Sequence, residues 1–299
     1  MAMRDYLIGE VALEHAEGHL SRREALRKLG LLGLSAVAAS GVLAACAPAQ
    51  TPSSAAPAAP APTPPKEPGY DVGAAAARAT LITFAGPAGE ISAAYAAPDG
   101  TPEGALLVVH ENRGLTDHFR AVTGRFSGDG YVVLTPDLLS RAGGTTAVPD
   151  ATAALGGIAA PDLVADLKAG LAELSRRHPG VPQAAMGFCF GGGMVWRLLD
   201  DGAPELAAAV PFYGPVPQNA TFDGNRAAVL AVYAERDQRV NATRDAAEAA
   251  LIAAGLTHEI VTVPGADHAF FNDTSPRFDP AAAAQMYRRV LDWYGTHLT

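Results

Sequence analysis

The sequence predicts an α/β fold in which helices cover both faces of a mostly parallel central sheet. From about residue 79 to the end, short apolar runs alternate with longer segments of helical periodicity, which is the pattern of a parallel sheet. The chain has 299 residues, 49% of them hydrophobic, and is therefore long enough to bury one sizeable core. We expect a single α/β domain over residues 79–299.

Residues 1–45 have the features of an export signal. Arg22 and Arg23 precede an apolar, Gly- and Ala-rich run over residues 29–45, which is short and weakly hydrophobic for a spanning helix. The run ends in the letters LAAC, which resemble the lipobox of bacterial lipoproteins and make Cys46 the expected lipidation site. We expect a twin-arginine leader, a type that exports folded proteins, and an exported chain held at a membrane through Cys46. The alternative is that the segment forms a buried N-terminal helix.

Residues 46–78 are expected to be a disordered tether. The stretch 51–68 is dense in Pro, Ala, Ser and Thr and offers almost nothing to bury. The chain has two cysteines, so a lipid on Cys46 would leave Cys189 without a partner for a disulfide. The presence of a single thiol in an oxidising compartment then needs an explanation other than a structural disulfide.

The elements of the domain follow from local patterns. Residues 81–84 and 91–97 predict an antiparallel pair, because a Gly-Pro-Ala-Gly turn joins them. The later strands are apolar and separated by helices, as buried parallel strands are. Leucines recur on one face of the helix expected at 162–177. The other expected strands are 105–110, 131–135, 184–187, 206–213, 229–233 and 258–263, and the other expected helices are 116–127, 191–199, 243–254 and 280–297.

Cys189 lies where a nucleophile would be expected. Gly187-Phe188-Cys189-Phe190-Gly191 has the form Gly-x-nucleophile-x-Gly between a strand and a helix. Such a turn is so tight that larger side chains two residues away would collide with the nucleophile. The N-terminus of the following helix favours the thiolate. The motif therefore predicts a cysteine nucleophile, although a buried cysteine often serves only as a small hydrophobic residue.

The same edge of the predicted sheet also supplies a base and an acid. Asp237 follows one strand and His268 follows the next, in the chain order nucleophile, acid, histidine. Carboxyl ends of parallel strands share one edge, so we expect Cys189, Asp237 and His268 to form a triad. Glu235 and Asp267 are alternatives to Asp237 as the acid.

Two further segments support a family resemblance. His110-Glu111-Asn112-Arg113-Gly114-Leu115 follows one predicted strand and Pro136-Asp137-Leu138-Leu139-Ser140-Arg141 follows another. Together with the cysteine motif they resemble the dienelactone hydrolase family of α/β-hydrolases, over about residues 79–298. The resemblance implies the α/β-hydrolase fold, a role for Glu111 in activating the cysteine, and a role for Arg141 in binding a substrate carboxylate. A second arginine of that family corresponds to Asn272 here, and Arg277 is the candidate replacement.

The expected function is hydrolysis of a small-molecule ester or lactone, as in carboxymethylenebutenolidase, through a thioester acyl-enzyme. The backbone N–H groups of Phe190 and Asn112 are expected to stabilise the oxyanion. We expect no cofactor and no metal, because the 8 histidines are scattered along the chain.

Other functions are less well supported by the sequence. The net charge of −9 and the absence of a basic cluster beyond the N-terminus argue against nucleic acid as a partner, and we expect a monomer. One alternative is a non-catalytic, lipid-anchored binding protein on the same scaffold, although all four expected catalytic residues are present. Another is a redox role for Cys189, which would lack a resolving cysteine.

Overall fold

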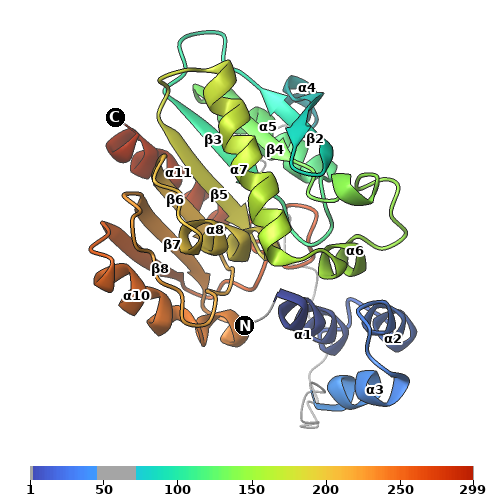
Figure 1. Ribbon diagram of the computed structural model, residues 1–299. Coiled ribbons are helices and arrows are strands. Elements are labelled where there is room, and N and C mark those ends of the chain that lie inside the picture. The colour runs from blue at the N-terminus through green and yellow to red at the C-terminus, as the bar shows by residue number, and fades with distance from the viewer. Residues whose placement is uncertain (1–2, 46–71, 299) are drawn as a thin grey trace.

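The protein is described here from a computed structural model that covers residues 3–45 and 72–298. Its centre is an eight-stranded sheet with the order β1-β2-β4-β3-β5-β6-β7-β8 (Figure 1). This arrangement confirms the predicted α/β class. The strands are β1 (Thr80–Gly86), β2 (Gly89–Ala96), β3 (Gly104–Val109), β4 (Tyr131–Pro136), β5 (Gln183–Phe188), β6 (Leu206–Phe212), β7 (Ala228–Ala234) and β8 (His258–Val263).

The sheet is mostly parallel, as expected. β1 pairs with β2 and β2 with β4 in antiparallel fashion, and every other neighbouring pair is parallel. β3 and β5 lie side by side, with Val109 opposite Gly187. Because both strands end at this level, the loop after β3 lies next to the turn that follows β5.

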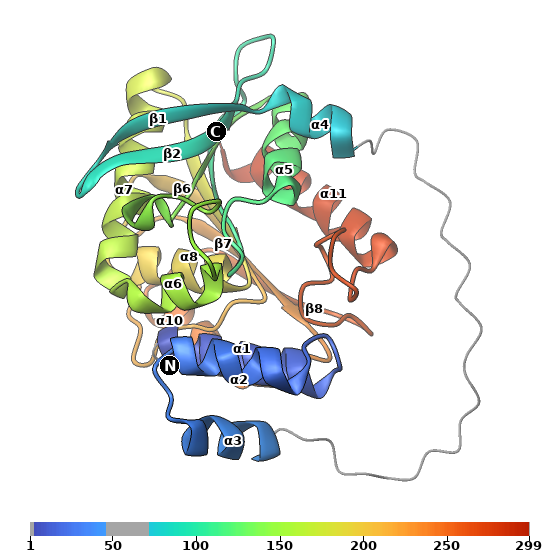
Figure 2. The same cartoon turned by 90° about the vertical axis from the view of Figure 1, so that its right-hand side faces the viewer.

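Helices cover both faces of the sheet. Figure 2 shows α5 and α11 on one face and α7 and α8 on the other. The four leucines of α7, at positions 163, 167, 171 and 174, are all buried, as their spacing predicted. The helices of the domain are α4 (Val72–Arg78), α5 (Asp117–Gly128), α6 (Ala151–Gly157), α7 (Ala160–Arg177), α8 (Phe190–Asp200), α9 (Gln238–Asn241), α10 (Arg244–Ala253) and α11 (Pro280–His297).

The structure differs from the expectation before β1. Residues 72–78, assigned to the tether, form α4, which packs on α5 so closely that a Cβ at Gly124 would lie 1.7 Å from the carbonyl oxygen of Ala75. The rest of the predicted tether, 46–71, and the lipidation site Cys46 lie outside the described residues. Helix α6 was not expected either, since its short Ala- and Gly-rich sequence carries little periodicity.

The N-terminal segment forms α1 (Met3–Ala16), α2 (Arg22–Leu31) and α3 (Ala36–Ala45). In both ribbon views these helices lie below the sheet, on the side of α6 and α10 (Figures 1 and 2). α1 is docked by its apolar face, which buries Tyr6, Leu7 and Val11. This is the packed arrangement that the alternative to an export leader anticipated, and whether the segment is later removed stays a prediction.

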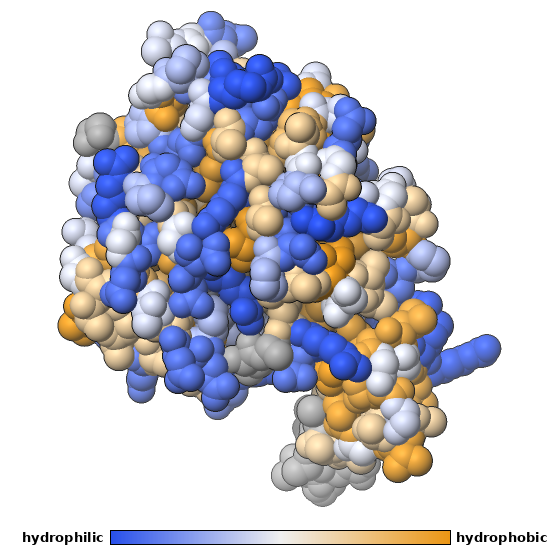
Figure 3. All heavy atoms as spheres, in the orientation of Figure 1, coloured by the Kyte–Doolittle hydropathy of each residue, from blue (hydrophilic) through white to orange (hydrophobic). Residues whose placement is uncertain are grey.

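Helix α3, which follows the helix with the twin arginines, differs from α1 in its exposed surface. α3 exposes Val37 and carries mostly small apolar residues, and Figure 3 shows apolar side chains gathered over this part of the molecule. Among the described residues, no helix is both long enough and apolar enough to cross a membrane.

Candidate active site

Cys189 occupies a strained turn between β5 and α8. Its backbone has φ 55° and ψ −116°, an unusual conformation for a residue other than glycine. A Cβ at Gly187 would lie 2.2 Å from the carbonyl oxygen of Gly191, and one at Gly191 would lie 2.2 Å from that of Val109. The two glycines therefore allow the turn to close and bring it against the end of β3. This is the geometry that the cysteine motif predicted.

His268 is held by Asp237. The His268 Nδ1 to Asp237 Oδ2 distance is 2.5 Å and both side chains are buried. Asp237 also accepts a hydrogen bond from the backbone N–H of Val240, which fixes the carboxylate at the start of α9. The competing acids lie elsewhere: Glu235 accepts from the backbone N–H of Gly265, and Asp267 pairs with Arg236. Of the three acids considered, Asp237 is the one placed against the histidine.

The other ring nitrogen of His268 faces the thiol. Nε2 has no partner within hydrogen-bond distance among the described residues, and it lies within 4.8 Å of Cys189 Sγ. One side of the cysteine is thus occupied by an imidazole whose far nitrogen is fixed by a carboxylate. The predicted residues Cys189, Asp237 and His268 come together in one place.

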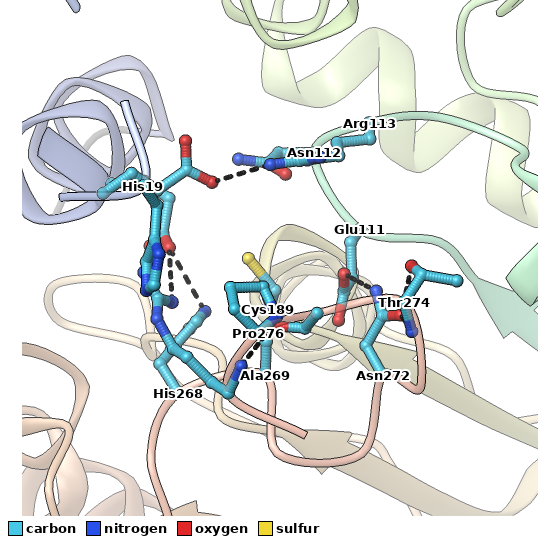
Figure 4. A pocket seen from close by; sticks show the side chains of 14 residues that line it. His19, Glu111, Asn112, Arg113, Cys189, His268, Ala269, Asn272, Thr274 and Pro276 are labelled. Atoms are coloured by element: carbon cyan, nitrogen blue, oxygen red, sulfur yellow. Dashed lines mark hydrogen bonds and ion pairs between the residues drawn. The ribbon is translucent and has the colours of Figure 1, made fainter. Parts of the chain in front are cut away.

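Glu111 lies on the opposite side of Cys189 (Figure 4). Asn272 Nδ2 donates a hydrogen bond to Glu111 Oε2 at 2.7 Å, and the Tyr213 hydroxyl donates to Oε1 at 3.4 Å. Asn272, which stands where the family has a second arginine, therefore positions the glutamate. Tyr213 has a positive φ of 34°, so it also sits in strained backbone. Asn112 lines the pocket as well, and its oxyanion role stays a prediction.

The two arginines considered for substrate binding have different positions. Arg141 makes a bidentate ion pair with Asp166, at 2.7 and 2.9 Å, and it does not line the pocket that contains Cys189. The structure thus does not support the role that the resemblance implied for Arg141, because Asp166 of α7 occupies its guanidinium. Arg277 does line the pocket, as the alternative expected.

The N-terminal helix adds residues that sequence reasoning did not find. The Tyr6 hydroxyl lies 3.2 Å from Cys189 Sγ, and Glu10 Oε1 lies 3.6 Å from His268 Nε2. Arg239 pairs with Glu10 as well. The spacing of Glu10 and Glu14 on one face of α1, with Glu17 in the turn after it, was a possible signal, but it lies in a segment that was set aside as a leader.

Charge and burial act together on the site. Burial and the Glu10 carboxylate raise the pKa of Cys189, outweighing the opposite effect of His268. Burial alone would lower the pKa of His268, but Glu10 and Asp237 together raise it well above its ordinary value. Burial alone would raise the pKa of Asp237, and the charge of His268 lowers it instead. In this arrangement a neutral thiol and an imidazolium ion are favoured.

A metal ion is a poor fit at this place. Glu10, Cys189 and His268 offer ligand atoms within 4.8 Å of one another. However, the Glu10 carboxylate already faces the guanidinium groups of Arg239 and Arg277. Two fixed positive charges favour an anion at this point rather than a cation.

Comparison with known proteins identifies the family. The model of the family described as "Dienelactone hydrolase family" matches residues 91–298. The chain belongs to the dienelactone hydrolase family. It is 32% identical over 228 residues to a Salmonella typhi protein named "Putative carboxymethylenebutenolidase", covering 70% of this chain and 83% of that one. A protein of the same name from Methylorubrum extorquens is 31% identical over 224 residues, covering 69% and 77%.

Solved structures agree with the family. A dienelactone hydrolase structure from Klebsiella pneumoniae, titled "putative", is 26% identical with a TM-score of 0.65, covering 73% of this chain and 98% of that one. An esterase from Pyrobaculum calidifontis shares the fold, with 15% identity, a TM-score of 0.58 and coverage of 76% and 89%. The chain is therefore an enzyme with the α/β-hydrolase fold that acts on esters or lactones. Helix α1 lies outside the family match.

Proposed function

We propose that this protein cleaves a carboxylic ester or lactone through a thioester acyl-enzyme, with Cys189 as the nucleophile. The single observation that carries the proposal is the position of His268 between Asp237 and Cys189. One imidazole nitrogen is fixed by the carboxylate at 2.5 Å, and the other faces a thiol on a strained strand-to-helix turn. A base oriented by an acid and directed at a nucleophile is the arrangement that acyl transfer requires.

The proposed first half of the reaction forms the thioester. His268 Nε2 takes the thiol proton as the sulfur of Cys189 bonds to the carbonyl carbon, and the carbonyl electron pair moves to oxygen. The N–H groups of Phe190 and Asn112 would stabilise that oxyanion, each contributing about 3 kcal/mol. When the oxyanion collapses, the carbon–oxygen bond breaks and the leaving alkoxide takes the proton from His268.

The second half releases the acid. His268 accepts a proton from water as the water oxygen attacks the thioester carbon, and the carbon–sulfur bond breaks to return the thiolate, which regains the proton. Asp237 keeps the imidazole in the required tautomer throughout. Glu111, fixed by Asn272 and Tyr213, adds a negative charge near the sulfur and would modulate its reactivity.

The experiment that tests this proposal is intact-mass spectrometry after brief mixing with 4-nitrophenyl acetate, a small ester. Cys46→Ser leaves Cys189 as the remaining cysteine of the chain, so any thioester maps to one residue. The Glu10→Gln variant, in which the carboxylate beside His268 Nε2 is neutralised, should show a transient acetyl adduct that Cys189→Ala abolishes together with turnover. Turnover that survives Cys189→Ala would refute the proposal, and bound ester without turnover would favour a binding protein.

We also propose that residues 1–45 direct export by the twin-arginine route and that lipid on Cys46 anchors the chain. Arg22 and Arg23 are exposed on α2, which leaves them accessible to a receptor. Incorporation of labelled palmitate that is lost in Cys46→Ser would support the anchor. Retention of the enzyme in the cytoplasm, insensitive to Arg22→Lys with Arg23→Lys, would refute the export route.

A further inference from the structure

Helix α1 lies beneath the carboxyl ends of the parallel strands, where Cys189 is placed. It contacts both α6 and α8, and Figures 1 and 2 show it below these two helices. A Cβ at Gly193 of α8 would lie 3.3 Å from Met3 Cε, and one at Gly156 of α6 would lie 3.5 Å from Leu7 Cδ1. The helix therefore spans the opening through which a substrate would approach the sulfur.

The docked face of α1 has the spacing of an amphipathic helix. Its buried side chains recur at i, i+3, i+4, i+7 and i+8, namely Met3, Tyr6, Leu7, Glu10 and Val11. A single helix of 14 residues is only marginally stable in water without such a face to bury. The order of α1 therefore depends on its staying docked, and a change on this face should release it.

Tyr6 of this face covers the nucleophile. Its ring is fully buried, and its hydroxyl lies 3.2 Å from Cys189 Sγ. The cysteine itself is only 3% exposed, although a nucleophile must meet its substrate. The two residues are 183 positions apart in the sequence, so the cover is no part of the turn that holds Cys189.

The space left beside Cys189 is small. The pocket has a volume of about 60 Å³, and Glu10, Glu14 and His19 of the N-terminal segment line it together with the catalytic groups (Figure 4). Ligand sites of enzymes commonly measure about 300–1,000 Å³. With α1 in place, the pocket has room for a few waters but not for an ester of ordinary size.

Glu10 of the same face interferes with the base. Its Oε1 lies 3.6 Å from His268 Nε2, the nitrogen that must accept the thiol proton. Its charge raises the pKa of His268 and, together with burial, that of Cys189. Glu10 thus becomes the anionic partner of an imidazolium ion, a place that the thiolate would take in an active cysteine hydrolase. The docked helix favours an inactive protonation state as well as closing the pocket.

Charged groups of the domain fix the register of the N-terminal segment. Arg239 of α9 pairs with Glu10, and its guanidinium carbon lies 4.3 Å from the centroid of the Tyr6 ring. Lys28 of α2 pairs with Asp150, the N-cap of α6, at 3.1 Å. Burial of apolar side chains supplies the attraction, and the ion pairs determine which residues of α1 face the sulfur.

We propose that α1 is an intramolecular inhibitor, which docks over Cys189 so that Tyr6 blocks the sulfur and Glu10 engages the imidazole of His268. Turnover then requires α1 to leave the sheet edge. The inference rests on the proposed role of Cys189 and adds the regulation of that site. The same residues belong to the proposed export leader, so loss of residues 1–45 would convert a silent precursor into an active enzyme.

The first arm of the test measures access to the thiol and does not depend on catalysis. In the Cys46→Ser chain, Cys189 is alkylated with iodoacetamide, and the limiting rate at high pH is compared so that thiolate fractions do not differ. Leu7→Asp would bury an unpaired charge in the docked face, so α1 should leave and the rate should rise about tenfold or more.

Two further variants support this arm. Tyr6→Ala removes the ring from above the sulfur and should also raise the limiting rate. Asp5→Asn, which changes a residue on the exposed face of the same helix, should leave it unchanged. Circular dichroism checks that the sheet persists in each variant.

The second arm measures turnover of 4-nitrophenyl acetate. Leu7→Asp should raise kcat/KM about tenfold or more over its parent, because a larger fraction of the chains is open. Asp5→Asn should match the parent. Adding Cys189→Ala to the Leu7→Asp chain should abolish the gain, which would assign the released activity to this site.

The outcomes separate the two proposals. Limiting alkylation rates that stay at the parent level in both Leu7→Asp and Tyr6→Ala would overturn the cover. Equal kcat/KM in Leu7→Asp and an active parent would overturn the inhibitory role. Faster alkylation without hydrolysis by any variant would support α1 as the barrier to the thiol and refute the nucleophilic role proposed for Cys189.

Discussion

The two sides of Cys189 are built in different ways. On one side the turn between β5 and α8, Asp237 and His268 all come from the family-matched region and are fixed by close backbone contacts and short hydrogen bonds. On the other side Tyr6 and Glu10 come from α1, outside that region, and are held by ion pairs to Arg239 and Arg277. The comparison shows that the chemical groups are complete within the domain, whereas access to them depends on a separate helix.

The largest expected effect is the loss of activity when the acid on the catalytic side of Cys189 is replaced. Asp237→Asn keeps the shape of the side chain but removes the charge that orients His268, so kcat should fall about 10⁴-fold. The ester assay described above, run in the Glu10→Gln chain, measures it. Asp267→Asn is the matched control, because that acid pairs with Arg236 and does not contact the histidine. A comparable loss in Asp267→Asn would show that the acid had been assigned to the wrong residue.

A second variant tests the role of Arg141. Arg141→Gln removes the bidentate partner of buried Asp166, so it should lower the free energy of unfolding by about 2 kcal/mol, measured by urea denaturation. Its KM for an acidic ester such as mono-4-nitrophenyl glutarate, measured in the Glu10→Gln chain, should stay the same, since Arg141 does not line the pocket. A raised KM with unchanged stability would restore the role that the family resemblance implied for this residue.

The smallest expected effect is on the pH dependence of kcat/KM, and it tests the influence of α1 on the pKa of His268. Burial alone would lower the pKa of His268, but Glu10, Asp237 and Cys189 all raise it, so the neutral base forms only at higher pH. Glu10→Gln removes one of these negative charges and lowers the pKa of His268. The acidic limb of the kcat/KM profile should therefore move to lower pH in Glu10→Gln and stay in place in Asp5→Asn. A shift to higher pH would contradict this assignment.

Much of the fold could be read from local patterns. The antiparallel opening pair, the parallel strands and α11 at residues 280–297 all appear where the sequence placed them. Periodicity and turn residues specify such elements because each depends on neighbours in the chain. α4 and α6 were missed because short helices of alanine and glycine owe their order to packing on other elements.

The candidate site likewise contains some residues whose positions local sequence patterns predicted and others that only tertiary packing placed. The glycines around Cys189 and the strand ends before Asp237 and His268 determined from the sequence alone that these three residues would meet, because parallel strands deliver their loops to one edge. Only the tertiary structure decided that Arg141 pairs with Asp166 and that Tyr6 and Glu10 lie on the nucleophile. Those contacts join residues distant in sequence through buried charges, and a charge carries no local signal of the partner that will neutralise it.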